Sequence, residues 1–251
     1  MASNSFLSTT TPRPNVPTAY GLRELYGGAM TVELPVDLID SSDLRQIPNH
    51  QEVFLSPTTL TSIIFEINDY QTPQHYGGQP ATSTTPTSTL SNPNSNVDGT
   101  GTTTTDSEAA KFHFTDVITG VDTLAAPLSS PQRVNLQKPS LASYPAYLLE
   151  GTIVSYDTRS PGGIPPLTSS QHQQQHQSSL VHQIQLLVRL QDHATDLCVR
   201  INVPLKEFAN NNGDGDVQAA ETETAFARDL LEHVVATLDV VDFSLFGGGE
   251  A

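Results

Sequence analysis

Two neighbouring runs of alternating apolar and polar residues stand out in the last third of the chain. Their apolar positions are Ile184, Leu186, Val188, Leu190, Leu197, Val199, Ile201 and Val203. A period of two is typical of a strand that buries one face, and the short polar turn at residues 192–195 joins the two runs. The pattern predicts an antiparallel hairpin that Pro204 ends. Cys198 falls on its polar face, near no evident base, and we interpret it as an ordinary strand residue.

Other strands are indicated by short stretches rich in β-branched and aromatic residues. Residues 51–55 and 62–67 carry Val, Ile and Phe between clusters of Pro, Ser and Thr, and residues 147–157 form a longer run. The chain enters a further candidate strand, residues 29–34, through Gly27-Gly28. This pair allows a turn or bulge because it carries no β-carbon.

Two longer segments have helical character. From residue 218 to about residue 238, apolar residues recur every four positions, at Phe226, Leu230, Val234 and Leu238. This stripe predicts a helix that packs on the sheet. Residues 106–119 predict a second helix, capped by Asp106 or Ser107. Its His113 has no partner at ligand spacing, so we assign it no role.

A shorter helix is expected between residues 34 and 48, where Asp40 or Ser41 can cap it and Pro48 stops it. Together these elements indicate an α+β fold, in which helices pack on an antiparallel sheet.

Several segments lack the apolar residues that a packed core needs. Residues 1–22, 71–105 and 160–179 consist mainly of Ser, Thr, Pro, Gln, Asn and Gly. Such segments cannot bury enough apolar surface to offset the entropy of ordering. We therefore expect a disordered N-terminal tail, a single domain at residues 23–246 with two disordered insertions, and a flexible tail at residues 247–251. His172, His176 and His182 invite a metal interpretation, but a Gln/His-rich loop explains them better, since nothing pre-organises the imidazoles.

The charge balance narrows the choice of partners. The chain has 11 Lys and Arg against 27 Asp and Glu, a net charge of −16. This argues against nucleic acid and against an anionic membrane surface, which both require clustered cations. No apolar run approaches the ~20 residues of a membrane span. Within residues 25–69, Arg45 is the only Lys or Arg among many carboxylates. This segment therefore favours a basic protein surface as its partner.

Four ordered blocks of the sequence resemble one family, the Ran guanine-nucleotide release factors (Mog-type Ran-binding proteins). The first block runs from LYGGA at residues 25–29 through Ile39-Asp40, DLR at residues 43–45 and Pro48 to QEVF at residues 51–54. The others are KFHF at residues 111–114 leading into Asp116, INVPL at residues 201–205 and VVDFSLF at residues 240–246. The resemblance implies a twisted, mainly antiparallel six-stranded sheet flanked by helices, an α/β/α sandwich similar to the photosystem protein PsbP.

The same resemblance implies a function without covalent chemistry. The protein is expected to bind the small GTPase Ran through an acidic surface and to promote release of its guanine nucleotide, supporting nucleocytoplasmic protein transport. It is expected to be monomeric, to need no cofactor, and to work in the nucleus and the cytoplasm.

The resemblance also points to site residues. It places Glu66 and Asp69 in the Ran-contacting patch, with Asp40, Asp43 and Glu52 as further candidates. It gives Gly27, Gly28, Arg45 and Pro48 a supporting role. Each candidate also has a structural interpretation, because Asp40 can cap the short helix, Arg45 can pair with Asp43 or Glu52, and Glu52 can be a solvated strand residue.

Two details bear on the geometry of this patch. Glu66 and Asp69 lie on opposite faces of a regular strand, so they share a surface only if the strand ends or bulges between them. Asn49 stands where the family usually has an acidic residue after the proline.

Three rival functions remain open. Asn210, Asn212, Asp214 and Glu221 match part of an EF-hand calcium loop, but the first position is Asn and no helix is expected before it. A calcium-responsive adaptor would use this loop. An enzyme could use Asp40, Ser41 and His50 as acid, nucleophile and base, although closeness in sequence is not triad geometry. A scaffold that binds Ran without exchanging its nucleotide has the same sequence features as the release factor.

Overall fold

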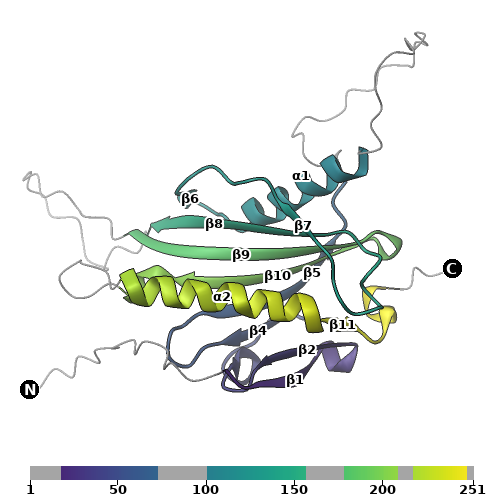
Figure 1. Cartoon of the computed structure of the whole chain (residues 1–251), viewed down its shortest axis with the longest axis horizontal. Coiled ribbons are helices and arrows are strands. Elements are labelled where there is room, and N and C mark those ends of the chain that lie inside the picture. Colours follow the sequence, from purple (N-terminus) through teal and green to yellow (C-terminus); the bar gives the residue numbers. More distant parts are fainter. Residues whose placement is uncertain (1–17, 73–100, 157–177, 209–216, 248–251) are drawn as a thin grey trace, which may run out of the picture.

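The computed structural model describes residues 18–72, 101–156, 178–208 and 217–247. Within them, the main element is an antiparallel sheet of eight strands (Figure 1). Its hydrogen-bonded order is β3 (Ile39–Asp40), β4 (Gln51–Leu55), β5 (Ser62–Asp69), β10 (Thr195–Pro204), β9 (Ser178–Leu190), β8 (Ala146–Tyr156) and β6 (Thr123–Leu124). The eighth strand, β7 (Gln132–Val134), also pairs with β8.

The predicted hairpin forms the centre of this sheet. β9 and β10 pair from Leu190 opposite Thr195 to Val181 opposite Pro204. A 3-10 turn, η4 (Gln191–His193), joins them, and Ala194 completes it with a left-handed backbone (φ 48°). The predicted strands at residues 51–55 and 62–67 are β4 and β5, and the run at residues 147–157 is β8.

A second, three-stranded sheet packs against the large one. Its order is β1 (Tyr20–Leu25), β2 (Met30–Pro35) and β11 (Asp239–Val240), again antiparallel. The turn η1 (Tyr26–Gly28) joins β1 to β2, as the glycine pair predicted. Figure 1 shows β1 and β2 below the large sheet, with β11 bringing the C-terminal part of the chain back to them.

Helix α2 (Val217–Thr237) covers one face of the large sheet and contributes to the main hydrophobic core. The aliphatic positions of the hairpin point to this face, and they pack with Leu230, Leu231 and Val234 of α2 and with Met30 and Val32 of β2. The stripe predicted from the four-residue spacing is therefore confirmed. One carboxylate, Glu223, is buried in this helix, where it accepts hydrogen bonds of 2.7 Å from the hydroxyls of Thr59 and Thr61. The 3-10 turn η6 (Phe243–Phe246) is the last element along the chain that belongs to this core.

Helix α1 (Gly101–Asp116) covers the opposite face, where Ala109, Ala110 and Phe114 pack on apolar residues of the sheet and polar contacts add to this packing. Arg189 Nε of β9 donates to Asp106 of α1 (3.2 Å), and His113 of α1 contacts Asp196 of β10 (2.7 Å). The amide of Gln185 donates to the carbonyl of Ala110 (2.9 Å). The polar side of the hairpin is therefore not a solvated face: it lies under a helix.

Some sequence-based expectations need correction. The first helix begins at Gly101, five residues before the predicted cap, and the Asp106 carboxylate pairs with Arg189 instead of capping a terminus. Residues 101–105 were expected in an insertion and are helical. The α+β class is confirmed, but the large sheet has eight strands rather than six, since it includes the two-residue strands β3 and β6 and the three-residue strand β7. Neither described helix is both long and apolar enough to cross a membrane.

Candidate partner-binding site

The turn η1 is fixed by the side chain of Tyr26. The backbone N–H of Tyr26 donates to Oε1 of Glu52 (2.8 Å), and the single O–H of its side chain is shared between the carbonyls of His50 (3.1 Å) and Phe65 (3.0 Å). Tyr26, Gly27 and Gly28 all have positive φ, which only the glycines adopt without steric cost. Burial raises the pKa of the Tyr26 hydroxyl, and the charges of Glu52 and Glu66 raise it further. The hydroxyl therefore remains a donor, and it links the turn to β4 and β5.

The short helix predicted before Pro48 is the 3-10 helix η2 (Ser41–Asp43). Asp40 caps it, accepting a hydrogen bond from the backbone N–H of Ser42 (2.8 Å). The backbone N–H groups of Leu44 and Arg45 both donate to the carbonyl of Ser41, at 3.1 and 3.0 Å. Pro48 then accepts from the N–H of Gln51, the first residue of β4. The cap predicted for Asp40 is thus present, and this loop is held at both of its ends.

A groove separates this loop from the turn η1 and from the C-terminal η6. Its lining residues are Tyr26, Ser42, Arg45, Gln46, Ile47, Pro48, Asn49, Gln51, Glu52 and Leu245. Three residues singled out by the resemblance, Arg45, Pro48 and Glu52, therefore come together here. Glu52 is not the solvated strand residue that one interpretation gave it, because it accepts the N–H of Tyr26 and so fixes the turn.

Glu66 is an anchored residue whose side chain is only 12% exposed. Its carboxylate pairs with Arg200 of β10 and accepts from the amide of Gln51, with His50 at 3.9 Å. Partial burial by itself would raise the pKa of Glu66, but Arg200 and the hydrogen bonds from Gln51 and Asn68 outweigh burial and lower it. The carboxylate is therefore held ionised and oriented by its own chain.

Asp69 differs from Glu66 in both exposure and direction. It is exposed, and the pairing of β5 with β10 runs regularly from Ser62 opposite Asn202 to Asp69 opposite Thr195. The strand therefore neither ends nor bulges between Glu66 and Asp69. A regular strand places Glu66 on the face covered by α1 and Asp69 on the other face, the same side as Phe65 and Glu52. The two acids lie at one end of the strand but do not share a face of the sheet.

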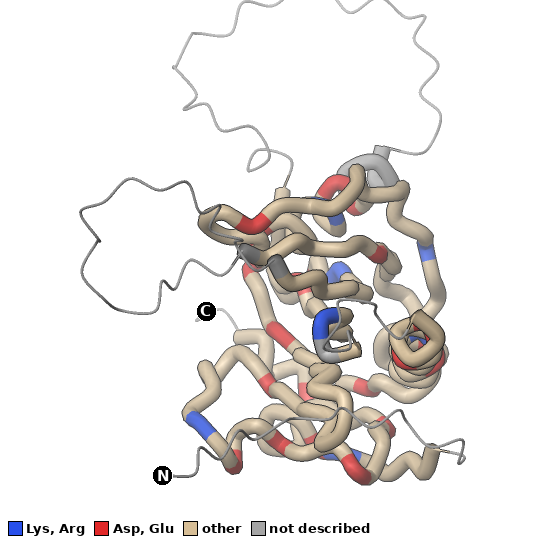
Figure 2. The backbone as a smooth tube through the Cα atoms, turned by 90° about the vertical axis from the view of Figure 1, so that its left-hand side faces the viewer, with Lys and Arg blue, Asp and Glu red and all other residues tan. Residues whose placement is uncertain are grey.

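The charges around these residues are mostly negative. Asp43 and Asp69 are exposed, and Arg45 forms no ion pair with any acid in the described ranges. The expected pairing of Arg45 with Asp43 or Glu52 is therefore not present. In Figure 2, acidic positions (red) outnumber basic ones (blue) along the lower part of the tube, where β1, β2 and β4 lie.

Comparison with known proteins decides the family. A model described as Ran-interacting Mog1 protein matches residues 23–204. The chain belongs to this Mog1 family. Among curated relatives, the Ran guanine nucleotide release factors of Bos taurus and Homo sapiens are 27% and 26% identical over 225 residues, covering 89% of this chain and 95% of each relative. The crystal structure of the Saccharomyces cerevisiae Ran-binding protein Mog1p is 24% identical, with a TM-score of 0.50, and covers 92% of this chain and all of its own. It supports the fold.

In this Mog1-family protein, sequence reasoning missed the residues that hold the site. Arg200 stands at a polar position of the predicted hairpin and was assigned no role, yet it anchors Glu66. His113 was assigned no role, yet it is buried and bonded to Asp196. Burial alone would lower the pKa of His113, but its contacts with Asp196 and Cys198 raise it to about 9. The available signal was the concentration of Gln, Arg and Asp on one side of the hairpin, which is unusual for a strand pair at the centre of a sheet.

The rival sites are not assembled in the described part of the chain. Ser41 is buried, and its hydroxyl has no hydrogen-bond partner there, so it does not form a triad with Asp40 and His50. Of the proposed calcium ligands, Asn210, Asn212 and Asp214 lie outside the described residues, as do His172 and His176 of the histidine tract. Among the described residues, no group of three or more His, Cys, Asp or Glu is placed to hold a metal ion.

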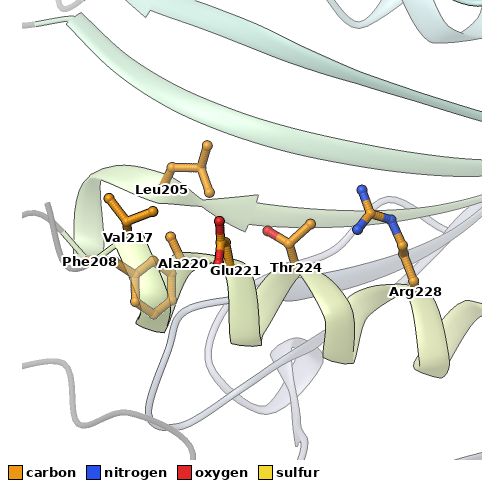
Figure 3. Close-up of a pocket in the computed structure, with 7 residues that line it drawn as sticks. All are labelled: Leu205, Phe208, Val217, Ala220, Glu221, Thr224 and Arg228. Atoms are coloured by element: carbon orange, nitrogen blue, oxygen red, sulfur yellow. The ribbon is translucent and has the colours of Figure 1, made fainter.

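The remaining calcium-loop residue, Glu221, lies in α2 at the edge of a different pocket (Figure 3). This pocket is lined by Leu205, Phe208, Val217, Ala220, Glu221, Thr224 and Arg228. Figure 3 shows its apolar side chains grouped at the start of α2, with Arg228 at the far end of the row. Arg228 is engaged by Glu150 of β8 (2.8 Å), so its charge is already paired.

Proposed function

We propose that this Mog1-family protein binds the small GTPase Ran through an acidic surface and promotes release of its guanine nucleotide, supporting nucleocytoplasmic transport. The nucleus and the cytoplasm are then its places of action. The observation that carries the proposal is the position of Asp69: an exposed carboxylate on a strand that is hydrogen-bonded on both sides, at the end where Glu66 is anchored. The family match and the names of the relatives supply the identity of the partner.

The geometry divides the candidate acids into two groups. Asp43 and Asp69 are exposed and are the acids that contact basic residues of the GTPase directly. Asp40 and Glu52 are committed to backbone N–H groups of η2 and η1, and Glu66 is committed to Arg200. These three acids shape the surface and make its potential negative, but they are not free to bind the partner.

Such a surface needs no covalent chemistry to release a nucleotide. A ligand shifts an equilibrium only by its differential affinity, so the protein accelerates release if it binds the nucleotide-free GTPase more tightly than the loaded one. A net charge of −16 increases the rate of encounter with a basic surface, and the few carboxylates that become desolvated supply binding energy.

The decisive experiment follows release of a fluorescent guanine nucleotide from purified Ran. We expect the wild-type protein to accelerate release, and added salt to weaken the effect because it screens the attraction. The double variant Asp43→Lys/Asp69→Lys should lose most of this activity, by about tenfold or more. Both positions are exposed, so the fold should tolerate the change.

The matched control is Asp229→Lys/Glu232→Lys on the outer face of α2, which gives the same change in net charge away from the site. If the two double variants lose activity equally, only the net charge matters, and the assignment of the surface is wrong. If Ran binds without faster release, the protein is a scaffold. If Ran does not bind at all, the proposed function fails.

A further inference from the structure

Arg45 is unusual in its surroundings. It is exposed on a loop between Asp43 and Glu52, and yet it contacts neither carboxylate nor any other acid in the described ranges. Arginines near carboxylates commonly pair with them, since the guanidinium presents several donors in a rigid fork. A free arginine in a strongly acidic surface leaves those donors available to a partner.

The backbone that carries Arg45 is firmly held. Its own N–H and that of Leu44 donate to the carbonyl of Ser41, a buried residue, and Asp40 caps the turn before them. A partner that contacts this loop therefore meets side chains on an ordered backbone, which lowers the entropy cost of binding.

The neighbouring residue adds an apolar contact. Leu44 is 67% exposed, directly beside Arg45. Arg45 itself lines the groove, together with the apolar residues Ile47, Pro48 and Leu245. An apolar side chain next to an unpaired arginine is the composition that interface centres favour, since arginine is enriched and other charged residues are depleted there.

We propose that Leu44 and Arg45 form a docking point for the GTPase, at which Arg45 pairs with a carboxylate of the partner and Leu44 packs beside that pair. This inference rests on the proposed function and deepens it. The acidic surface selects basic residues of the partner, and Arg45 adds one contact of opposite polarity. A mixed pattern of this kind fixes the orientation of docking, because a partner that is only basic would be repelled at Arg45.

The proposal is tested by the direction in which one substitution changes the affinity for Ran. If Arg45 only weakens the negative field, Arg45→Glu makes the surface more acidic and binding to Ran becomes tighter. If Arg45 pairs with a carboxylate, Arg45→Glu weakens binding, by about tenfold, through faster dissociation. Arg45→Lys keeps the charge but loses the planar fork, so it should fall between the wild type and Arg45→Glu.

The experiment measures association and dissociation of each full-length variant on immobilised Ran, both loaded with nucleotide and nucleotide-free. Lys206→Glu is the matched control for charge, because Lys206 is exposed on η5 (Leu205–Phe208), beyond the opposite end of β10. Leu44→Ser should also weaken binding, whereas Leu22→Ser should not, although Leu22 is 69% exposed on β1. Melting temperatures equal to that of the wild type establish that each variant is folded.

The outcomes separate the two proposals. If Arg45→Glu binds Ran as tightly as Lys206→Glu or more tightly, while the wild type binds and Asp43→Lys/Asp69→Lys does not, the docking point is wrong and the acidic surface stands. If the wild type does not bind Ran, both proposals fail. If Arg45→Glu and Leu44→Ser are weakened while their controls are not, the docking point is established.

Discussion

At the scale of single residues, similar carboxylates have different tasks because their neighbours differ. Glu66 and Asp69 are three positions apart on one strand, but Glu66 is bound by Arg200 and Asp69 is exposed. The Arg200 side chain is 5% exposed and also donates to Gln185 Oε1 (3.2 Å) and to the carbonyl of His113 (3.1 Å). Removing Glu66 would therefore leave a buried cation short of its counter-charge, which is costly.

We accordingly expect Glu66→Gln to lower the free energy of unfolding at neutral pH by about 2–4 kcal/mol. The pKa of Glu66 is lowered in the folded protein, so its contribution is present above the pKa of the unfolded state, about 4.3, and is lost as the pH falls through the folded value. Urea unfolding from pH 7 to pH 3 should show a smaller loss of stability for Glu66→Gln than for the wild type. Equal slopes would mean that the pair with Arg200 does not stabilise the fold.

Asp69→Asn is the companion variant, because it removes a charge that has no ion-pair partner among the described residues. Its free energy of unfolding should stay within about 0.5 kcal/mol of the wild type, as for most surface substitutions. The contrast between the two variants also guides the functional test: a loss of Ran binding in Glu66→Gln has to be judged against its stability, whereas a loss in Asp69→Asn reports on the contact itself.

At the scale of elements, local pattern predicts strands and helices well, but not which polar face becomes buried. The alternation in β9 and β10 identifies the hairpin because burial of one face is a local property of the sequence. The other face looks solvated, since Gln185, Arg189 and Arg200 are polar. Their partners Asp106 and Glu66 lie far away along the chain, and no periodicity reports a pairing over such a distance. The family resemblance identified the acidic candidates, but only the structure shows which residues hold them in place.

The docking of α1 should be sensitive to pH through His113. Its pKa of about 9 lies above the ordinary value of about 6.5, so its contribution to stability is complete below pH 6.5 and is lost as the pH rises through 9. We expect the free energy of unfolding of the wild type to fall by about 3 kcal/mol between pH 6.5 and pH 9.5. The groups that face this histidine from the sheet are Asp196, which also binds Arg189, and Cys198.

His113→Gln should be less stable at pH 6.5 and should show little of this pH dependence. Cys198→Ala is the comparison variant: the contact with Cys198 helps to raise the pKa of His113, so this variant should keep the pH dependence in reduced form. If Cys198→Ala, and not His113→Gln, removes the slope, the titrating group is the cysteine and the assignment to His113 is wrong. Chemical denaturation at half-unit steps of pH would resolve the two cases.

At the scale of the whole molecule, the net negative charge opposes the association of copies through an exposed strand edge. Among the described strands, β1 forms one edge of the small sheet and carries the exposed Leu22, and an edge of this kind can add a strand from another chain. With a net charge of −16, copies of the protein repel one another, and we expect a monomer of 27.0 kDa at neutral pH. The same charge that draws a basic partner thus opposes pairing between copies.

Copies of the protein should therefore associate when the net charge is removed. The isoelectric point is about 4.6, and near that pH the repulsion between copies is lost. We expect sedimentation velocity at pH 4.6 to show association, and Leu22→Lys to reduce it, because a lysine on an edge strand opposes pairing. Val121→Lys, at a position that is 52% exposed outside any strand, gives the same change in charge and should reduce association much less. Equal protection by both variants would show that association follows net charge alone, and that the edge of β1 takes no part in it.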